Sequence, residues 1–191
     1  MVNFTSNTYQ MKREILSFSN KISKHLSKPD KKFSADMTYG MLAAGSCLLT
    51  DVVEQLHEDT KKVNSVERLT RHLNNGTSFT ALKSYLTAIR KWAPQEPVIH
   101  IDDSDVVKPD GYKFEALGLV RDGSKSTASK TVYEKGYHVT EACVLTKNNH
   151  PVSIFSKIHS SKEKNFTSNN DVTFSAMERG AALFGKATFA M

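Results

Sequence analysis

The sequence has few cysteines and no long apolar run. Only two cysteines occur among 191 residues, Cys47 and Cys143, far apart and each within an apolar stretch. This placement predicts two buried free thiols rather than a disulfide or a metal site. No stretch approaches the roughly 18 apolar residues that a membrane helix needs. Residues 1–15 also lack the basic and apolar regions of a signal peptide, so we expect a cytoplasmic protein.

Basic residues outnumber acidic residues in the first half of the chain only. Residues 1–94 contain 14 Lys and Arg against 8 Asp and Glu, whereas residues 95–191 contain 12 of each. The entire net charge of +6 therefore belongs to the first half. Such an excess favours a polyanionic partner for that half, and nucleic acid is the partner we expect.

The first half has the periodicity of helices. Residues 8–26 carry an apolar stripe at three- and four-residue steps, and 34–57 form a more apolar segment with Ser34 as the expected N-cap. Shorter helices are predicted over 65–74, after a capping box, and over 79–93, after Ser78. The last two resemble a helix-turn-helix pair, and the alternative is a solvated basic face on a small bundle. The candidate DNA-binding residues on this pair are Arg68, Arg71, His72, Lys83, Arg90 and Lys91.

After Pro97 the pattern becomes strand-like, and an α/β fold is expected. Apolar residues over 98–102 predict a first strand, and 137–158 predict a hairpin of two strands. Residues 172–185 read as a helix with Asp171 as N-cap and Gly185 as its end. A final apolar strand is expected over 186–191, and 108–136 is expected to be a long loop.

Three carboxylates gather at the tip of the first expected strand in the segment "PVIHIDDSDVVKP", residues 97–109. Asp102, Asp103 and Asp105 are expected at the carboxyl end of that strand, where open α/β sheets bind ligands. Carboxylates are suited to Mg²⁺ or Mn²⁺. Because a strand alternates, Asp102 and Asp103 should point to opposite faces and should not both bind one metal. The alternative is an Asp-rich surface turn.

The segments "HIDDSDVVKP", "GYHVTEACVL", "PVSIFSKIHSSKEK" and "TFSAMERGAALFGKATFAM" resemble a DDE transposase of bacterial insertion sequences. The subgroup has an RNase H-like transposase domain and a later Tyr-Arg-Glu-Lys signature. The resemblance covers nearly the whole chain and is most specific over 97–191. It implies a helical DNA-binding region over 1–94, followed by the first part of the RNase H-like domain over 95–191. It also implies DNA strand cleavage and transfer by two Mg²⁺ or Mn²⁺ ions held by Asp, Asp and Glu.

The resemblance assigns roles by position. The family pattern of an apolar residue two before the first catalytic Asp fits Asp103, with Asp102 as the alternative. Asp103 would be both catalytic and a metal ligand. Lys108 would contact phosphate, and Asp105 would orient the turn or contact DNA. The implied partners are the terminal inverted repeats of a transposon, with association as a homodimer or with a full-length transposase, in a bacterial cytoplasm near the nucleoid.

The sequence departs from the family pattern at its end. The second catalytic Asp should follow the strand at 186–191, and the Glu should come later still. We therefore expect the amino-terminal portion of a transposase, truncated and inactive by itself. One alternative is a non-catalytic DNA-binding regulator or inhibitor derived from a transposase. Another is an unrelated metal-dependent phosphatase or nuclease, with candidate ligands at His138, Glu141, His150 and His159.

Overall fold

The structure is a computed structural model that describes residues 4–76 and 79–191, with side chains from residue 9 onward. The chain divides into two compact units, Met1–Ala88 and Ile89–Met191, and each is described by itself. No helix within the described residues is both long and apolar enough to cross a membrane.

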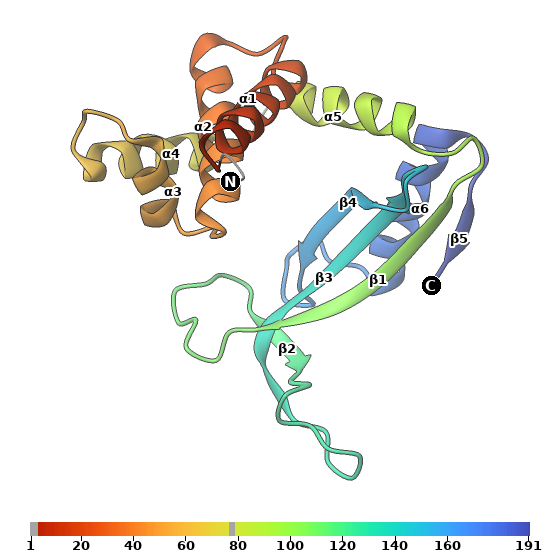
Figure 1. Cartoon of the computed structure of the whole chain (residues 1–191). Coiled ribbons are helices and arrows are strands. Elements are labelled where there is room, and N and C mark those ends of the chain that lie inside the picture. Colours follow the sequence, from red (N-terminus) through yellow and green to blue (C-terminus); the bar gives the residue numbers. More distant parts are fainter. Residues whose placement is uncertain (1–3, 77–78) are drawn as a thin grey trace. The chain divides into compact units, whose positions relative to one another are not determined.

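The first unit is helical, and its course can be followed in Figure 1. Its helices are α1 (Phe4–Ile22), α2 (Lys28–Ala44), α3 (Leu49–Leu56) and α4 (Lys62–Asn75), and α5 (Phe79–Trp92) begins in this unit and ends in the second. The expected N-cap of α5, Ser78, lies outside the described residues. The α4 helix begins after Lys61, which makes no side-chain capping bond, rather than after the predicted capping box.

The prediction of one helix over 34–57 is wrong, because two helices cover this region. Ser27, not Ser34, caps α2, and its Oγ accepts a hydrogen bond from the Asp30 backbone N–H. Pro29 then occupies the first turn, where a missing N–H costs nothing. Gly45 ends α2 in the left-handed conformation, with φ of 61°, and separates it from α3.

The core of the helical unit is formed by α2, α3 and α4. Phe33, Val52, Val53 and Leu69 are its buried side chains. Gly40 lies directly beneath Val52, and a Cβ atom there would collide with the valine side chain. Gly40 thus allows α2 and α3 to approach each other closely. Cys47, in the turn that follows α2, is exposed, so the prediction of a buried thiol is wrong there.

The second unit is a mixed sheet with one helix, so the α/β fold class is confirmed. Its elements are β1 (Val98–Val107), β2 (Gly118–Arg121), β3 (Tyr133–Leu145), β4 (Pro151–His159), α6 (Asn169–Phe184) and β5 (Thr188–Ala190). Strand β3 pairs antiparallel with β1, β2 and β4, whereas β5 pairs parallel with β1. The predicted hairpin at 137–158 corresponds to β3 and β4, and the final strand corresponds to β5.

Strand β1 extends five residues beyond its expected end. Asp103 lies opposite Thr140, and Asp105 lies opposite His138, so the acids stand within the strand rather than at its tip. The pairing uses backbone groups, which Asp supplies as well as any other residue. The predicted loop over 108–136 is also too long, because it contains β2 and the start of β3.

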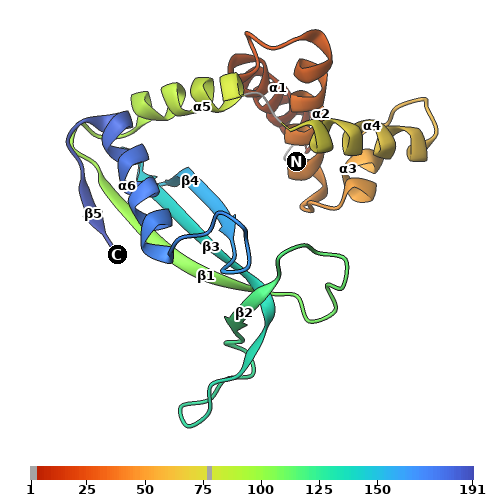
Figure 2. The ribbon, with the colours of Figure 1, turned by 180° about the vertical axis from the view of Figure 1, so that it is seen from behind.

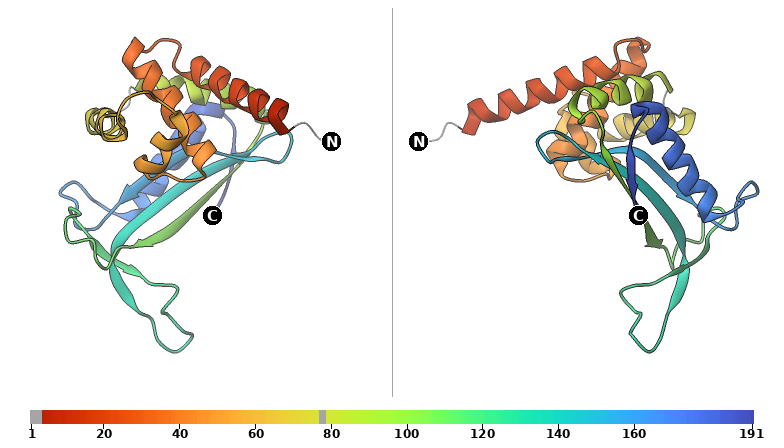
Figure 3. Two further views of the ribbon diagram at one scale, coloured as in Figure 1. Left: turned by 60° about the vertical axis from the view of Figure 1, so that its left-hand side comes forward. Right: turned by 90° about the vertical axis from the view of Figure 1, so that its right-hand side faces the viewer.

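Helix α6 covers one face of the sheet, as Figure 2 shows from behind and Figure 3 from the side. The helix approaches β1 closely at Gly180, where an added Cβ would collide with Ile99. Its N-cap is Ser168 rather than Asp171, since the Ser168 Oγ accepts from the Asp171 N–H at 3.1 Å. Gly185 ends the helix as predicted.

Candidate functional site

The carboxylates of β1 lie on two different faces of the sheet. Ile99, which packs beneath α6, shares its face with Asp103 and Asp105, because strand side chains alternate. Asp102 points to the opposite face. Asp102, Asp103 and Asp105 are all exposed residues. The structure therefore separates the two neighbouring acids, as the alternation in sequence predicted.

Asp103 is held by a hydrogen-bonded chain across three strands. The Thr140 hydroxyl lies 2.5 Å from the Asp103 Oδ1 and 2.9 Å from the His159 Nε2. A carboxylate can only accept, so Thr140 donates its single proton to Asp103. Thr140 then accepts from His159, whose hydrogen must be on Nε2. The chain Asp103–Thr140–His159 thus fixes both the carboxylate and the imidazole tautomer.

His159 is fully buried in a stack of rings. Its ring centroid lies 5.6 Å from that of His138 and 5.9 Å from that of Phe166. Burial, followed by the nearby His138, lowers the pKa of His159 and so favours the neutral imidazole. Its Nδ1 is buried without a hydrogen-bond partner among the described residues. This fits the tautomer that Thr140 selects, in which Nε2 carries the hydrogen and Nδ1 has only a lone pair.

Asp105 connects three strands. Its Oδ1 lies 2.6 Å from the His138 Nδ1 on β3, and its Oδ2 accepts from the Arg121 backbone N–H on β2 at 3.1 Å. Both carboxylate oxygens therefore have protein partners. Asp105 therefore joins β1 to its neighbouring strands, whereas the sequence suggested that it orients a turn.

The opposite face of the sheet carries the alternative carboxylate, Asp102. Asp102 lies directly across from Glu141 in the β1–β3 pair, and like charges in that position repel each other. Cys143 is two residues further along β3, and burial, followed by the Glu141 charge, raises the pKa of its thiol. No hydrogen bond to another side chain fixes Asp102 in the described part of the chain.

Among the described residues, Asp103, the metal ligand expected from the sequence, is not joined by further acids in a metal-binding arrangement. No group of three or more His, Cys, Asp or Glu side chains gathers there in a metal-binding arrangement. On the α6-covered face, Asp105 is already paired, and Asp103 keeps its Oδ2 without a hydrogen-bond partner among these residues. A two-metal site requires several acids from different elements, so Asp103 alone does not form one.

Two of the candidate DNA-binding residues are engaged within the helical unit. Arg68 donates to Asp36 at 2.7 Å and to Glu58 at 3.0 Å, joining α4 to α2 and to the turn after α3. The hydrogen bond from Lys32, followed by that from Ser65, lowers the pKa of Glu58 to about 2. This network gives Arg68 a structural role inside the unit.

His72 has a similar internal position. Its ring stacks on Phe33 with centroids 5.0 Å apart, and its Nδ1 lies 3.7 Å from an Asp30 carboxylate oxygen. The remaining candidates are exposed and form no ion pair within the described residues. These are Arg71, Lys83, Arg90, Lys91 and Lys108.

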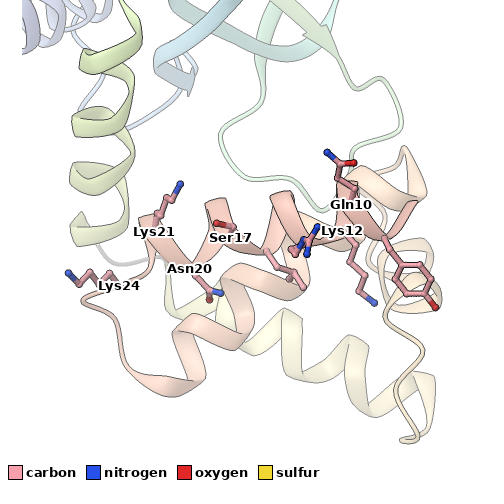
Figure 4. A pocket seen from close by; sticks show the side chains of 9 residues that line it. Gln10, Lys12, Ser17, Asn20, Lys21 and Lys24 are labelled. Carbon is pink, nitrogen blue, oxygen red and sulfur yellow. The ribbon is translucent and has the colours of Figure 1, made fainter. Parts of the chain in front are cut away.

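The sequence reasoning missed a basic face on α1 and the turn that follows it. Figure 4 shows polar side chains projecting from this face, which lines an open groove of about 1100 Å³. The residues that line it are Tyr9, Gln10, Lys12, Arg13, Leu16, Ser17, Asn20, Lys21 and Lys24. They recur every three or four positions, so the same periodicity that revealed the apolar stripe could have revealed the basic face opposite.

Comparison of the chain with protein-family models and with curated proteins finds no match.

Proposed function

We propose that the chain is a transposase polypeptide of the insertion-sequence type. Its helical first half binds DNA at the ends of a transposon, and its sheet carries Asp103, the first carboxylate of a metal-dependent site for DNA strand cleavage and transfer. Such a protein would work at the nucleoid of a bacterial cell. The sequence motifs at 97–191 provide the family assignment, and the geometry of the two units supports it.

The observation that carries the proposal is the arrangement of elements around Asp103. The resemblance requires a strand with the first acid, a hairpin, a helix and then a further strand. The second unit has β1, the β3–β4 hairpin, α6 and β5 in that order, with β5 parallel to β1. Parallel neighbours bring their carboxyl ends to the same edge of a sheet. In this register Ala190, at the end of β5, lies beside His100, three residues before Asp103 in β1.

The hydrogen bonds of the site favour Asp103 over Asp102 as the catalytic carboxylate. Thr140 holds one oxygen of Asp103, and His159 holds Thr140. A carboxylate fixed in this way loses little conformational entropy when its other oxygen binds a ligand. Asp102 faces another acid and lacks such support.

When bound, a pair of divalent metals would activate the attacking oxygen and stabilise charge on the leaving oxygen. The contribution of this chain is to present the Asp103 Oδ2 in a fixed orientation. Residues 1–94 would supply the DNA affinity through phosphate contacts, since the positive charge of the protein is concentrated there. Sites with two metals use several acids, so Asp103 would act together with carboxylates besides those described.

The proposal is tested by DNA binding with sequences that flank the reading frame. Labelled duplexes carrying the inverted repeats and duplexes with the same bases scrambled are titrated with the chain in a gel-shift assay. We expect tighter binding to the repeats, unchanged in Asp103→Asn, because Asp103 serves the chemistry rather than the affinity. Equal binding to both duplexes would contradict recognition of transposon ends. A large loss in Asp103→Asn would contradict the division of roles.

A further inference from the structure

We propose that the basic face of α1 and the following turn, with Arg13, Lys21 and Lys24, is the surface that contacts the phosphate backbone of duplex DNA. The inference rests on the proposed function and assigns its DNA contact to a helix outside the expected helix-turn-helix pair. It follows from the orientation of α1, the excess of cations over carboxylates among the described residues of this face and the internal use of Arg68.

The orientation of α1 leaves this face available. The opposite side of the helix packs on α2, where Ser19 and Ser23 are fully buried and the Ser19 hydroxyl lies 3.1 Å from that of Ser34. Arg13, Lys21 and Lys24 are exposed. The fold thus uses one side of α1 for the core and presents the other to solvent.

The charges on this face are not neutralised by neighbours. None of the three cations forms an ion pair within the described residues. The single acid of α1, Glu14, lies at the edge of the groove, where it accepts a hydrogen bond from the lining residue Gln10 at 3.1 Å. Four cations line the groove, so one carboxylate at its edge leaves a positive surface that attracts a polyanion.

The dimensions of the face suit a nucleic-acid duplex. Arg13 and Lys21 are eight residues apart, which corresponds to roughly 12 Å along a helix axis. Duplex DNA carries one charge about every 1.7 Å along its axis, so a surface of this length lies beside several phosphates. Ser17 and Asn20, between the cations, add hydroxyl and amide groups that can donate to phosphate oxygens.

Two alternatives, membrane binding by α1 and DNA binding by α4, fit the contacts of these helices less well. An amphipathic helix binds a membrane through its apolar face, and the side of α1 around the buried Ser19 and Ser23 packs on α2. Helix α4 offers fewer free cations than its sequence suggests, because Arg68 is paired with Asp36 and Glu58. A DNA backbone is the partner that the free face of α1 fits best.

The test compares two triple variants of the full chain with equal loss of charge. The first carries Arg13→Gln, Lys21→Gln and Lys24→Gln. The matched control carries Lys28→Gln, Lys61→Gln and Lys62→Gln, which are exposed cations of the same unit outside the groove. Affinity for a fluorescent duplex is measured by anisotropy over a series of salt concentrations, and helix content is checked by circular dichroism.

We expect the α1 variant to bind at least tenfold more weakly at about 0.1 M salt, with the salt slope reduced by about 2 to 3 for three lost phosphate contacts. The control should change affinity less than threefold. Conservative replacement by Arg13→Lys should keep most of the affinity, which guards against a variant that simply fails to fold.

The outcomes separate the inference from the function on which it rests. Equal weakening in both triple variants would show dependence on net charge alone and would overturn the inference. Unchanged binding in a folded α1 variant would overturn it as well, while leaving DNA binding intact. A wild-type chain that binds no duplex would overturn the proposed function and the inference together. Binding to single-stranded RNA or anionic vesicles, but not to the duplex, would replace DNA with that partner.

Discussion

Thr140 donates a hydrogen bond to Asp103 over 2.5 Å, and it accepts one from the buried His159. Thr140→Val should keep the shape of the side chain and remove both bonds. The His159 N–H would then be buried without an acceptor, which costs about 1 to 3 kcal/mol. Thr140→Ser retains the hydroxyl and should lose less. Denaturant unfolding followed through Trp92, the single tryptophan and a residue of the second unit, measures the difference. Equal stability of Val and wild type would contradict the hydrogen-bonded chain.

Gly180 allows α6 to approach β1 at Ile99. Gly180→Ala places a methyl group where the end of the buried Ile99 side chain lies, so that side chain, the helix or the strand must move. Overpacking of this kind costs about 1 to 3 kcal/mol and should outweigh the better helix propensity of Ala. Glu178→Ala, at an exposed position of the same helix, is the control and should change stability by less than about 0.5 kcal/mol. A Gly180→Ala protein as stable as the control would contradict the close contact.

The ion pairs of Glu58 predict a pH dependence for the helical unit. Its folded pKa is about 2 against an ordinary value of 4.5, mainly because of the hydrogen bond from Lys32. The stabilisation is fully present above pH 4.5 and is lost as the pH falls toward 2, because the unfolded chain takes up the proton first. Glu58→Gln should reduce the free energy of unfolding by about 2 kcal/mol at pH 7. The difference from wild type should disappear below about pH 2. A constant difference across this range, measured by circular dichroism, would exclude the ion-pair origin.

The choice between the two neighbouring acids predicts the location of metal binding. Paramagnetic Mn²⁺ broadens amide resonances near its site, and broadening should centre on Asp103, Thr140 and the nearby part of β1. We expect weak binding, because a single free carboxylate competes poorly with water for the ion. Asp103→Asn should abolish the broadening, whereas Asp102→Asn should leave it unchanged. The reverse result would place the site on the opposite face, beside Glu141.

Much of the fold follows from local sequence patterns. The apolar periodicity predicts α1 and α6, and Gly185 marks where α6 ends. The apolar runs and the turn at 147–150 predict the β3–β4 hairpin. Strand β1 is longer than predicted because Asp disfavours strands only weakly when a partner strand supplies the full ladder of hydrogen bonds. The cap at Ser27 is hard to predict because Pro29 resembles a break in the sequence, although a proline fits the first turn of a helix.

The candidate site depends on contacts that a single sequence does not reveal. Asp103 and Thr140 are 37 residues apart, and Thr140 and His159 are 19 apart. Their meeting is set by the register of three strands, and a shift by one residue would turn each side chain to the other face. The internal role of Arg68 likewise depends on Asp36, which lies 32 residues earlier. Charge pattern alone predicts a basic region, and packing decides which cations remain free.

The most direct test of the account is the salt dependence of duplex binding by the unmodified chain. Fluorescence anisotropy is recorded with a labelled transposon-end duplex at salt concentrations from about 50 to 300 mM, and the logarithm of affinity is plotted against that of salt. The account predicts a straight line with a slope of about −3 or steeper, because each phosphate contact contributes about −0.9. Absence of binding at the lowest salt, or an affinity that does not change with salt, would contradict the assignment of residues 1–94 to DNA.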